Sequence, residues 1–193
     1  YKAILGKIGP IIYYLMFSIA TSISKLISVR NYILRGKKGT VIHPSQLDSN
    51  WLRKTKIPDL RKFKLLYVGR IRPEKGILSF VSLIKNKRDI SLTIVGAEKD
   101  ASYKINQSNV NLHQNQTSKN KLIKFYDDHN IFVLPSYTEG HPMVMLEALA
   151  RRRPVIVFQE IEHVIGKKKG VFVSKRNFIN FLGTLNHIKK NYK

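Results

Sequence analysis

The feature that most constrains the fold is a series of short apolar segments, four or five residues long, that alternate with helical segments. The apolar segments lie at 64–68, 91–95, 131–134 and 154–158. Helical patterns lie at 74–84, 119–127, 143–150 and 177–190. Strands that are apolar on both faces are typical of a parallel sheet covered by helices on both sides. The sequence therefore predicts an α/β fold of this kind.

Glycines and polar residues follow three of these strands. They are Gly69 and Arg70, Gly96, and the segment 136–139. In open parallel sheets a ligand binds at the carboxyl ends of the strands. A binding site is therefore expected at this edge.

Composition limits the class of protein. The 193 residues include no cysteine, which excludes disulfide scaffolds, thiolate zinc sites and cysteine nucleophiles. There are 35 Lys and Arg against 12 Asp and Glu, a net charge of +23, and the first 47 residues and the segment after Glu162 contain no acid. Such a charge attracts nucleotide phosphates, anionic lipids or nucleic acid, or it is simply a solvated basic surface. No motif typical of nucleic-acid binding accompanies it, so that partner is not expected.

Isoleucines and leucines between residues 4 and 27 recur at the spacing of one helix face. Pro10 marks a kink or the start of this helix. The unbroken apolar run, 11–17, is shorter than the about 18 residues that span a bilayer, so a transmembrane helix is not expected. A packed helix of a globular domain is the first expectation, and a helix at a membrane surface is the second. The predicted organisation is then residues 1–44, a linker at 45–62, and a main domain at 63–193.

A first cluster of candidate site residues runs from Gly69 to Gly76. Gly69 allows the backbone to approach a ligand closely. Arg70 and Lys75, the latter at the start of a helix, suit the oxygens of a diphosphate. The alternative is a surface turn with solvated basic side chains.

A second cluster follows the strand at 131–134. Glu139 lies in the loop, Glu147 lies about one turn into the next helix, and backbone N–H groups of 140–144 lie between them. Carboxylates accept hydrogen bonds from sugar hydroxyls, and the N–H groups at a helix start bind anions. The alternative is a helix cap at Glu139 and a solvated Glu147, but the apolar run 143–149 makes an unpaired carboxylate costly there.

Glu139 and Glu147, separated by seven residues after Pro-Ser, resemble the signature of retaining glycosyltransferases of the GT-B fold, family 4 in particular. Leu66–Arg70 with Lys75-Gly76 resembles the donor-diphosphate motif of that family, and Pro154–Ile156 follows at the matching distance. The resemblance implies the C-terminal, Rossmann-like donor domain of a GT-B fold. Residues 1–44 would be the tail of an acceptor domain that is otherwise absent, so the chain is expected to be processed or a fragment.

The resemblance also implies roles for individual residues. Arg70, Lys75 and Glu139 would be catalytic: the two cations would bind the donor diphosphate, and Glu139 would hold hydroxyls of the transferred sugar. Glu147 would hold the ribose. Further donor contacts would come from Gly69, Gly140, His141, Pro142, Met143 and Val144. No metal and no cofactor are expected besides the donor.

Three positions depart from the family pattern. His141 replaces an aromatic residue, Gln114 replaces a glycine near the expected nucleotide base, and an arginine, best matched by Arg152, replaces a glycine before Pro154. His141 can still pack or form a hydrogen bond, and the arginine is a contact to an anionic surface or a solvated turn. Gln114 leaves the identity of the donor open.

The function that the resemblance implies is transfer of a sugar from a nucleotide-diphosphate-sugar to a cell-surface polysaccharide or glycolipid, with retention and without a metal. The expected location is the cytoplasm, with the basic ends at the anionic inner face of the membrane. The alternative is a truncated or degenerate glycosyltransferase that binds nucleotide-sugar without turnover.

Overall fold

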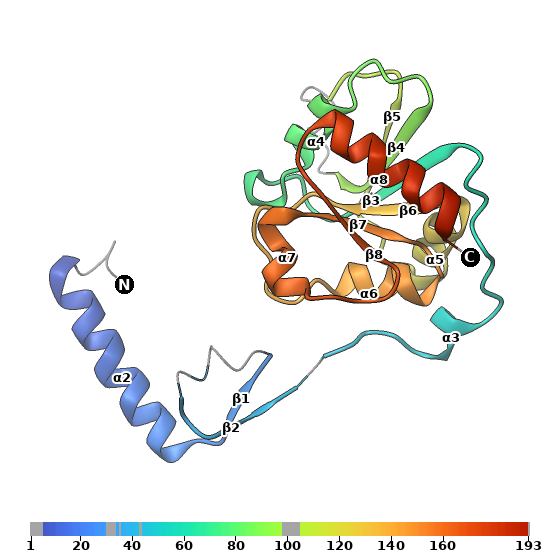
Figure 1. Cartoon of the computed structure of the whole chain (residues 1–193). Helices are drawn as coiled ribbons and strands as arrows, with labels where there is room; N and C mark the ends of the chain where they lie inside the picture. The colour runs from blue at the N-terminus through green and yellow to red at the C-terminus, as the bar shows by residue number, and fades with distance from the viewer. Residues whose placement is uncertain (1–5, 30–33, 35, 43, 98–104, 193) are drawn as a thin grey trace. The chain divides into compact units, whose positions relative to one another are not determined.

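The structure is a computed structural model that describes residues 6–29, 34, 36–42, 44–97 and 105–192. The chain divides into two compact units, Tyr1–Pro44 and Ser45–Lys193 (Figure 1). Each unit is described by itself. The assignment of the first unit to an acceptor domain stays a prediction.

The second unit is built on one parallel sheet. Its strands are β3 (Phe63–Val68), β4 (Ile90–Ala97), β5 (Val110–Gln114), β6 (Ile131–Leu134), β7 (Val155–Phe158) and β8 (Val171–Ser174). They pair in the order β5-β4-β3-β6-β7-β8, and every pair is parallel. The chain runs from β3 outward to β5 and then returns to the other side of β3, so the strand order reverses between β3 and β6. That reversal is where ligands bind in such sheets.

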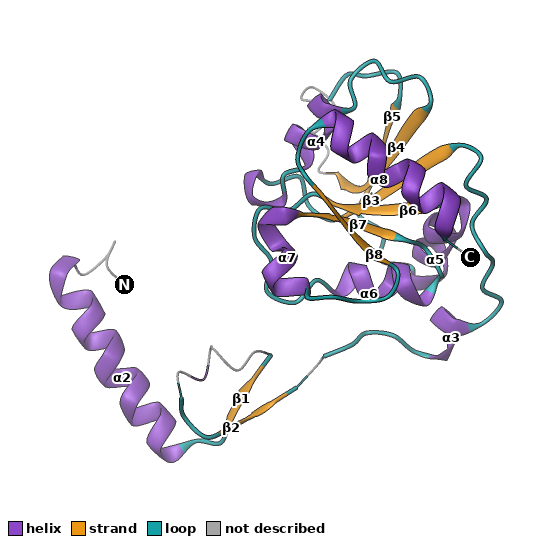
Figure 2. Cartoon of the chain, viewed as in Figure 1, coloured by secondary structure: helices purple, strands orange, loops and turns teal. Residues whose placement is uncertain are grey.

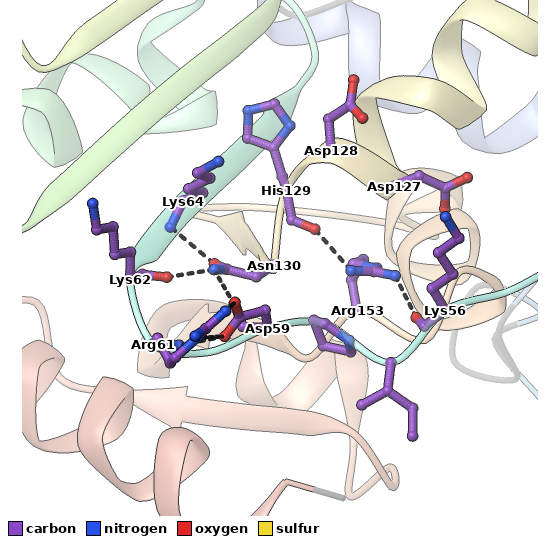
Figure 3. A pocket seen from close by; sticks show the side chains of 12 residues that line it. Lys56, Asp59, Arg61, Lys62, Lys64, Asp127, Asp128, His129, Asn130 and Arg153 are labelled. Atoms are coloured by element: carbon purple, nitrogen blue, oxygen red, sulfur yellow. Dashed lines mark hydrogen bonds and ion pairs between the residues drawn. The ribbon is translucent and has the colours of Figure 1, made fainter.

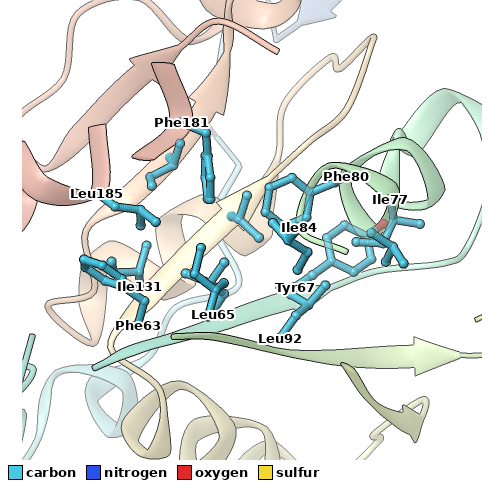
Figure 4. Packing of buried hydrophobic residues seen from close by; sticks show 14 of the residues in the cluster. Phe63, Leu65, Tyr67, Ile77, Phe80, Ile84, Leu92, Ile131, Phe181 and Leu185 are labelled. Carbon is cyan, nitrogen blue, oxygen red and sulfur yellow. The ribbon is translucent and has the colours of Figure 1, made fainter. Parts of the chain in front are cut away.

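Helices cover both faces of this sheet (Figure 2), as predicted. They are the short helix η3 (Pro73–Lys75), α3 (Ser49–Leu52), α4 (Ile77–Leu83), α5 (Lys119–Asp128), α6 (Met143–Ala150), α7 (Gln159–Ile165) and α8 (Phe178–Asn191). The buried residues of α4 and α8 pack on one face, where Phe80 and Phe181 meet edge to face with ring centroids 5.1 Å apart (Figure 4). Those of α3, α5, α6 and α7 pack on the other face.

Two helices differ from the prediction. The helix expected over 74–84 is divided at Gly76, whose φ of +62° ends η3 before α4 begins. Helix α7 was not predicted; it starts directly after β7 and buries Ile161, Val164 and Ile165.

The segment predicted as a linker, 45–62, belongs to the second unit and packs against its helices. Trp51 in α3 is 2% exposed and meets the ring of Tyr126 edge-on at 5.5 Å. Arg151 donates from Nη1 to the carbonyls of Trp51 and Arg53, at 2.9 and 2.8 Å. Backbone carbonyls of this segment thus accept hydrogen bonds from a buried arginine, which holds the segment in place.

Arg152, at the position where the family pattern has glycine, adopts the left-handed φ of +57° and is exposed. Its neighbours Arg151 and Arg153 are each 2% exposed. Only the middle residue of the three arginines therefore contributes charge to the surface.

The first unit contains η1 (Gly6–Ile8), α2 (Gly9–Ile23), and the parallel strands β1 (Leu26–Ser28) and β2 (Gly39–Val41). Pro10 lies in the first turn of α2, where its missing N–H is tolerated. The two helical stretches together, Gly6–Ile23, have a mean hydropathy of 1.2 and are long and apolar enough to cross a membrane. Protein cores and signal sequences contain such helices too, so the expected environment of α2 stays a prediction.

Candidate functional site

The two predicted clusters lie at the carboxyl edge of the sheet, after neighbouring strands. Gly69 and Arg70 follow β3, and the loop 135–142 follows β6. Because β3 and β6 pair directly, the loops that follow them are neighbours.

The backbone at Gly69 requires glycine. Its φ is +154°, and a Cβ atom there would lie 2.8 Å from the Tyr67 hydroxyl. Tyr67 donates to the carbonyl of Arg70 at 2.9 Å, and burial together with the charge of Glu139 holds the pKa of Tyr67 well above its usual value, so the phenol stays protonated. The hydrogen bond from Tyr67 thus fixes the backbone of Arg70, while the Arg70 side chain is exposed to solvent.

A hollow of about 540 Å³ lies beside Gly69 and Arg70, at the ends of β3, β4 and β5. Gln114, which the resemblance compares with a glycine, contributes to its lining. The hollow is therefore lined both by residues of the first cluster and by Gln114, which was expected near the nucleotide base.

Lys75 and Glu139 are in direct contact. Lys75 Nζ donates to Glu139 Oε1 at 2.7 Å, and the Ser136 hydroxyl donates to the same oxygen at 2.7 Å. The exposed fractions of the side chains are 27% for Lys75 and 9% for Glu139, so the pair is mostly removed from water. The fold thus joins two residues of the predicted catalytic set that lie in separate motifs.

The close approach of the two loops depends on Gly76. A Cβ atom on Gly76 would lie 2.0 Å from the Pro135 carbonyl oxygen, a distance that no side chain tolerates. The amide of Tyr137 donates to the Glu74 carbonyl at 2.9 Å, and its hydroxyl donates to Ser79 Oγ at 2.8 Å. These contacts hold the loop with Glu139 beside the short helix with Lys75.

Glu147 is buried in α6 and is 6% exposed. Its Oε2 accepts a hydrogen bond from the Tyr126 hydroxyl at 2.8 Å. Burial raises the pKa of Glu147 above its usual value, and the Tyr126 hydrogen bond offsets part of that rise. Within the described part of the chain, no hydrogen bond joins Glu147 to Lys75 or Glu139. The structure therefore gives Glu147 a partner of its own.

The remaining predicted donor contacts lie where α6 starts. Gly140 is exposed, His141 is half-buried, and Pro142 precedes the first helical residue, Met143, with Val144 next. The backbone N–H groups of these residues, except Pro142, which has none, find no acceptor carbonyl within α6. The helix start thus offers donors of the kind that the sequence predicted.

Sequence reasoning did not single out three residues that support the site: Tyr126, Ser136 and Arg176. Ser136 stands in the Pro-Ser pair that the motif includes, which is the one available signal. Tyr126 and Arg176 lie far from their partners in the sequence, so no local pattern marks them. Among the described residues, no group of three or more His, Asp and Glu side chains is arranged to hold a metal ion.

A different hollow, of about 600 Å³, is lined by residues before β3, before β6 and before β7 (Figure 3). Asn130 donates to the Asp59 carbonyl at 2.7 Å, and Arg153 donates to the His129 carbonyl at 2.9 Å. None of the predicted site residues lines it. Its polar side chains hold the segment 56–62 in place, which is a structural role.

Comparison with known proteins places the second unit in a family. The profile of the group 1 glycosyl transferases matches residues 48–193. The chain is 32% identical over 149 residues to the capsular polysaccharide biosynthesis glycosyltransferase CapM of Staphylococcus aureus. The matched stretch covers 69% of this chain and 38% of CapM. It is also 31% identical over 109 residues to the D-inositol 3-phosphate glycosyltransferase of an Arthrobacter strain. That match covers 49% of this chain and 26% of the relative. The chain thus spans well under half the length of these relatives.

Solved structures show the same fold at low sequence identity. Sucrose-phosphate synthase from Thermosynechococcus elongatus superposes with a TM-score of 0.71 at 16% identity, over 98% of this chain and 56% of that structure. The lipopolysaccharide outer core galactosyltransferase WaaB superposes with a TM-score of 0.63 at 17% identity, over 88% of this chain and 54% of that structure. The Rossmann-like sheet of this chain is part of a GT-B fold.

Proposed function

The chain belongs to the group 1 glycosyl transferases, and from this premise we propose that its second unit is the donor-binding domain of a sugar transferase. The donor is a nucleotide-diphosphate-sugar, and the acceptor is a cell-surface polysaccharide or glycolipid. The transfer retains the anomeric configuration and uses no metal. CapM, a relative named for capsular polysaccharide biosynthesis, supports the class of acceptor.

The proposed role of Arg70 and Lys75 is to bind the diphosphate. Negative charge builds up on the leaving diphosphate as the glycosidic bond breaks, and fixed cations stabilise that charge more than they stabilise the intact donor. Lys75 is held in place by Glu139, while the side chain of Arg70 is exposed beside the hollow at the ends of β3 and β4. One cation is held in an ion pair and the other is exposed to solvent, and together they can bind the two phosphates.

The carboxylates bind hydroxyl groups in this proposal. Glu139 accepts from hydroxyls of the transferred sugar, and Glu147 accepts from the ribose. Ionised carboxylates only accept hydrogen bonds, whereas sugar hydroxyls can donate them. The backbone N–H groups of Gly140, His141, Met143 and Val144, at the start of α6, add donors for the sugar and phosphate oxygens.

The contact between Lys75 and Glu139 is the observation that carries this proposal. A lysine and a carboxylate from separate loops meet, mostly out of water, at the edge where the strand order reverses. A surface turn with solvated charges, the alternative considered from the sequence, would not bury this pair.

Calorimetric titration with UDP-sugars and GDP-sugars tests the donor site. The native chain should bind one class of nucleotide-sugar saturably. The double variant Arg70→Ala/Lys75→Ala should bind at least about 100-fold more weakly, since a hydrogen bond to a charged group contributes about 1.5–3 kcal/mol and two are removed. The matched control, Lys85→Ala/Arg88→Ala, removes the same charge from exposed positions before β4 and should bind like the native chain.

Equal weakening in both double variants would contradict the site, because it would mean that net charge alone attracts the nucleotide. Turnover with an acceptor extract then separates the enzyme from the alternative, a truncated or degenerate chain that binds without turnover. That alternative is kept because the chain spans 38% of the length of CapM.

A further inference from the structure

Arg176 lies in the loop between β8 and α8 and contacts the end of β7, the start of α7 and the loop after β6. Its Nε donates to Glu160 Oε1 at 2.7 Å, and its Nη2 donates to the Pro135 carbonyl at 2.8 Å. The guanidinium also lies over the rings of Tyr137 and Phe158, with Cζ 4.2 and 4.5 Å from their centroids. One side chain from the edge of the sheet therefore reaches across β7 to the loop that carries Glu139.

The same guanidinium approaches Gly76. Its Nη1 lies 3.3 Å from the position that a Cβ atom on Gly76 would occupy, next to the Pro135 carbonyl. The Pro135 carbonyl thus lies close to Gly76 and also accepts a hydrogen bond from Arg176. Both contacts fix the first residue of the loop that carries Glu139.

The ion pair of Arg176 and Glu160 is incompletely satisfied. Arg176 Nη1 and Glu160 Oε2 are buried atoms without a hydrogen-bond partner among the described residues. The side chains are partly exposed, 16% for Arg176 and 33% for Glu160, and an ion pair in contact with solvent adds little net stability. Its main consequence is therefore geometric: it fixes where the guanidinium lies.

We propose that Arg176 is a positioning residue that holds the loop 135–139 against Gly76, so that Glu139 meets Lys75. The effect on the loop follows from these contacts alone. The effect on donor binding rests on the proposed function, because it assumes that Lys75 and Glu139 bind the donor.

Amide hydrogen exchange tests the positioning role without any ligand. In Arg176→Ala, the amide of Tyr137, which donates to the Glu74 carbonyl, should exchange at least about 10-fold faster, as for the loss of one charge-assisted hydrogen bond. The amides within β3 and β4 should keep their native rates. Lys175→Ala is the matched control, because it removes the same charge from the adjacent exposed residue and should leave Tyr137 unchanged.

If Arg176→Ala fails to fold, two conservative variants still test the proposal. Arg176→Lys keeps the charge but can form only one of the two hydrogen bonds, and Glu160→Gln keeps the shape but removes the charge of the partner. Each should accelerate exchange of Tyr137 less than Arg176→Ala does. Native rates at Tyr137 in these variants, or equal acceleration throughout the sheet, would overturn the proposal.

Titration of the same variants measures the effect on the donor. Arg176→Ala should bind a nucleotide-diphosphate-sugar about 10-fold more weakly and a nucleoside monophosphate as tightly as the native chain does, because Lys75 and Glu139 are assigned to the diphosphate and the sugar. Equal weakening of both ligands would indicate general loosening and contradict the positioning role. If the native chain binds neither ligand, the proposed function fails, while the exchange measurement still decides the role of Arg176.

Discussion

At the scale of single residues, Glu147 combines its proposed binding role with a cost in stability. It is buried, and its pKa in the folded chain is raised, so folding favours the protonated form. A raised pKa of an acid gives stability that is fully present below the unfolded pKa and lost as the pH rises through the folded pKa. Ionised Glu147 therefore lowers the free energy of unfolding at neutral pH.

Glu147→Gln should accordingly raise the free energy of unfolding at neutral pH and weaken nucleotide-sugar binding, since the neutral amide is a weaker acceptor for the ribose. The gain in stability should disappear below the usual pKa of a glutamate. Urea unfolding across this pH range and calorimetric titration measure the two effects. The control, Glu162→Gln, changes an exposed glutamate and should move neither stability nor its pH dependence. A loss of stability in Glu147→Gln at neutral pH would contradict the assignment.

At the scale of secondary-structure elements, Arg151 ties α5 and α3 to the end of α6. It is 2% exposed, it pairs with Asp127 at 2.7 Å, and it donates to the carbonyl of Trp51 at 2.9 Å. This guanidinium and the burial of Trp51 attach the first part of the segment 45–62, whereas Asn130 and Arg153 hold its second part.

Arg151→Ala should lower the free energy of unfolding by about 3 kcal/mol, because it leaves the Asp127 carboxylate and the backbone carbonyls without their donor. Urea unfolding monitored by the fluorescence of Trp51, the single tryptophan of the chain, reports both the loss and the detachment of α3. Arg152→Ala removes the same charge from an exposed position and should change stability little. Equal effects of the two variants would show that charge, and not the buried contacts, matters.

At the scale of the whole molecule, the charge distribution predicts binding to anionic membranes. The seven basic residues before Asp48 and the eight after Glu162 have no acidic residue among them. Each basic residue near an anionic surface contributes about 1 kcal/mol, and salt screens this attraction. Sedimentation should therefore show binding to vesicles with anionic lipids, weaker binding as salt rises, and little binding to neutral vesicles. Binding that is independent of salt would contradict an electrostatic origin.

Much of the fold was predictable because its signals are local. The apolar segments predicted β3, β4, β6 and β7, and the glycines and polar residues after them indicated the edge that carries the site. The division of the helix at Gly76 and the start of α7 immediately after β7 were not predicted. The break at Gly76 depends on the close approach of the Pro135 carbonyl, which leaves no periodic pattern in the sequence. Helix α7 does have an apolar pattern at helical spacing, in Ile161, Val164 and Ile165, but it follows β7 without an intervening turn and without a side-chain cap.

The sequence by itself determined the α/β class, the edge of the sheet that carries the candidate site, and the residue types gathered there, because apolar periodicity and glycine placement act over a few neighbouring residues. Only the tertiary structure decided which of those residues meet. Lys75 and Glu139 are 64 positions apart, and Pro135 and Arg176 are 41 apart, yet each pair is in contact. Such contacts follow from strand order, since the alignment of parallel strands brings distant loops to one edge. That order is a property of the folded sheet and not of any segment within it.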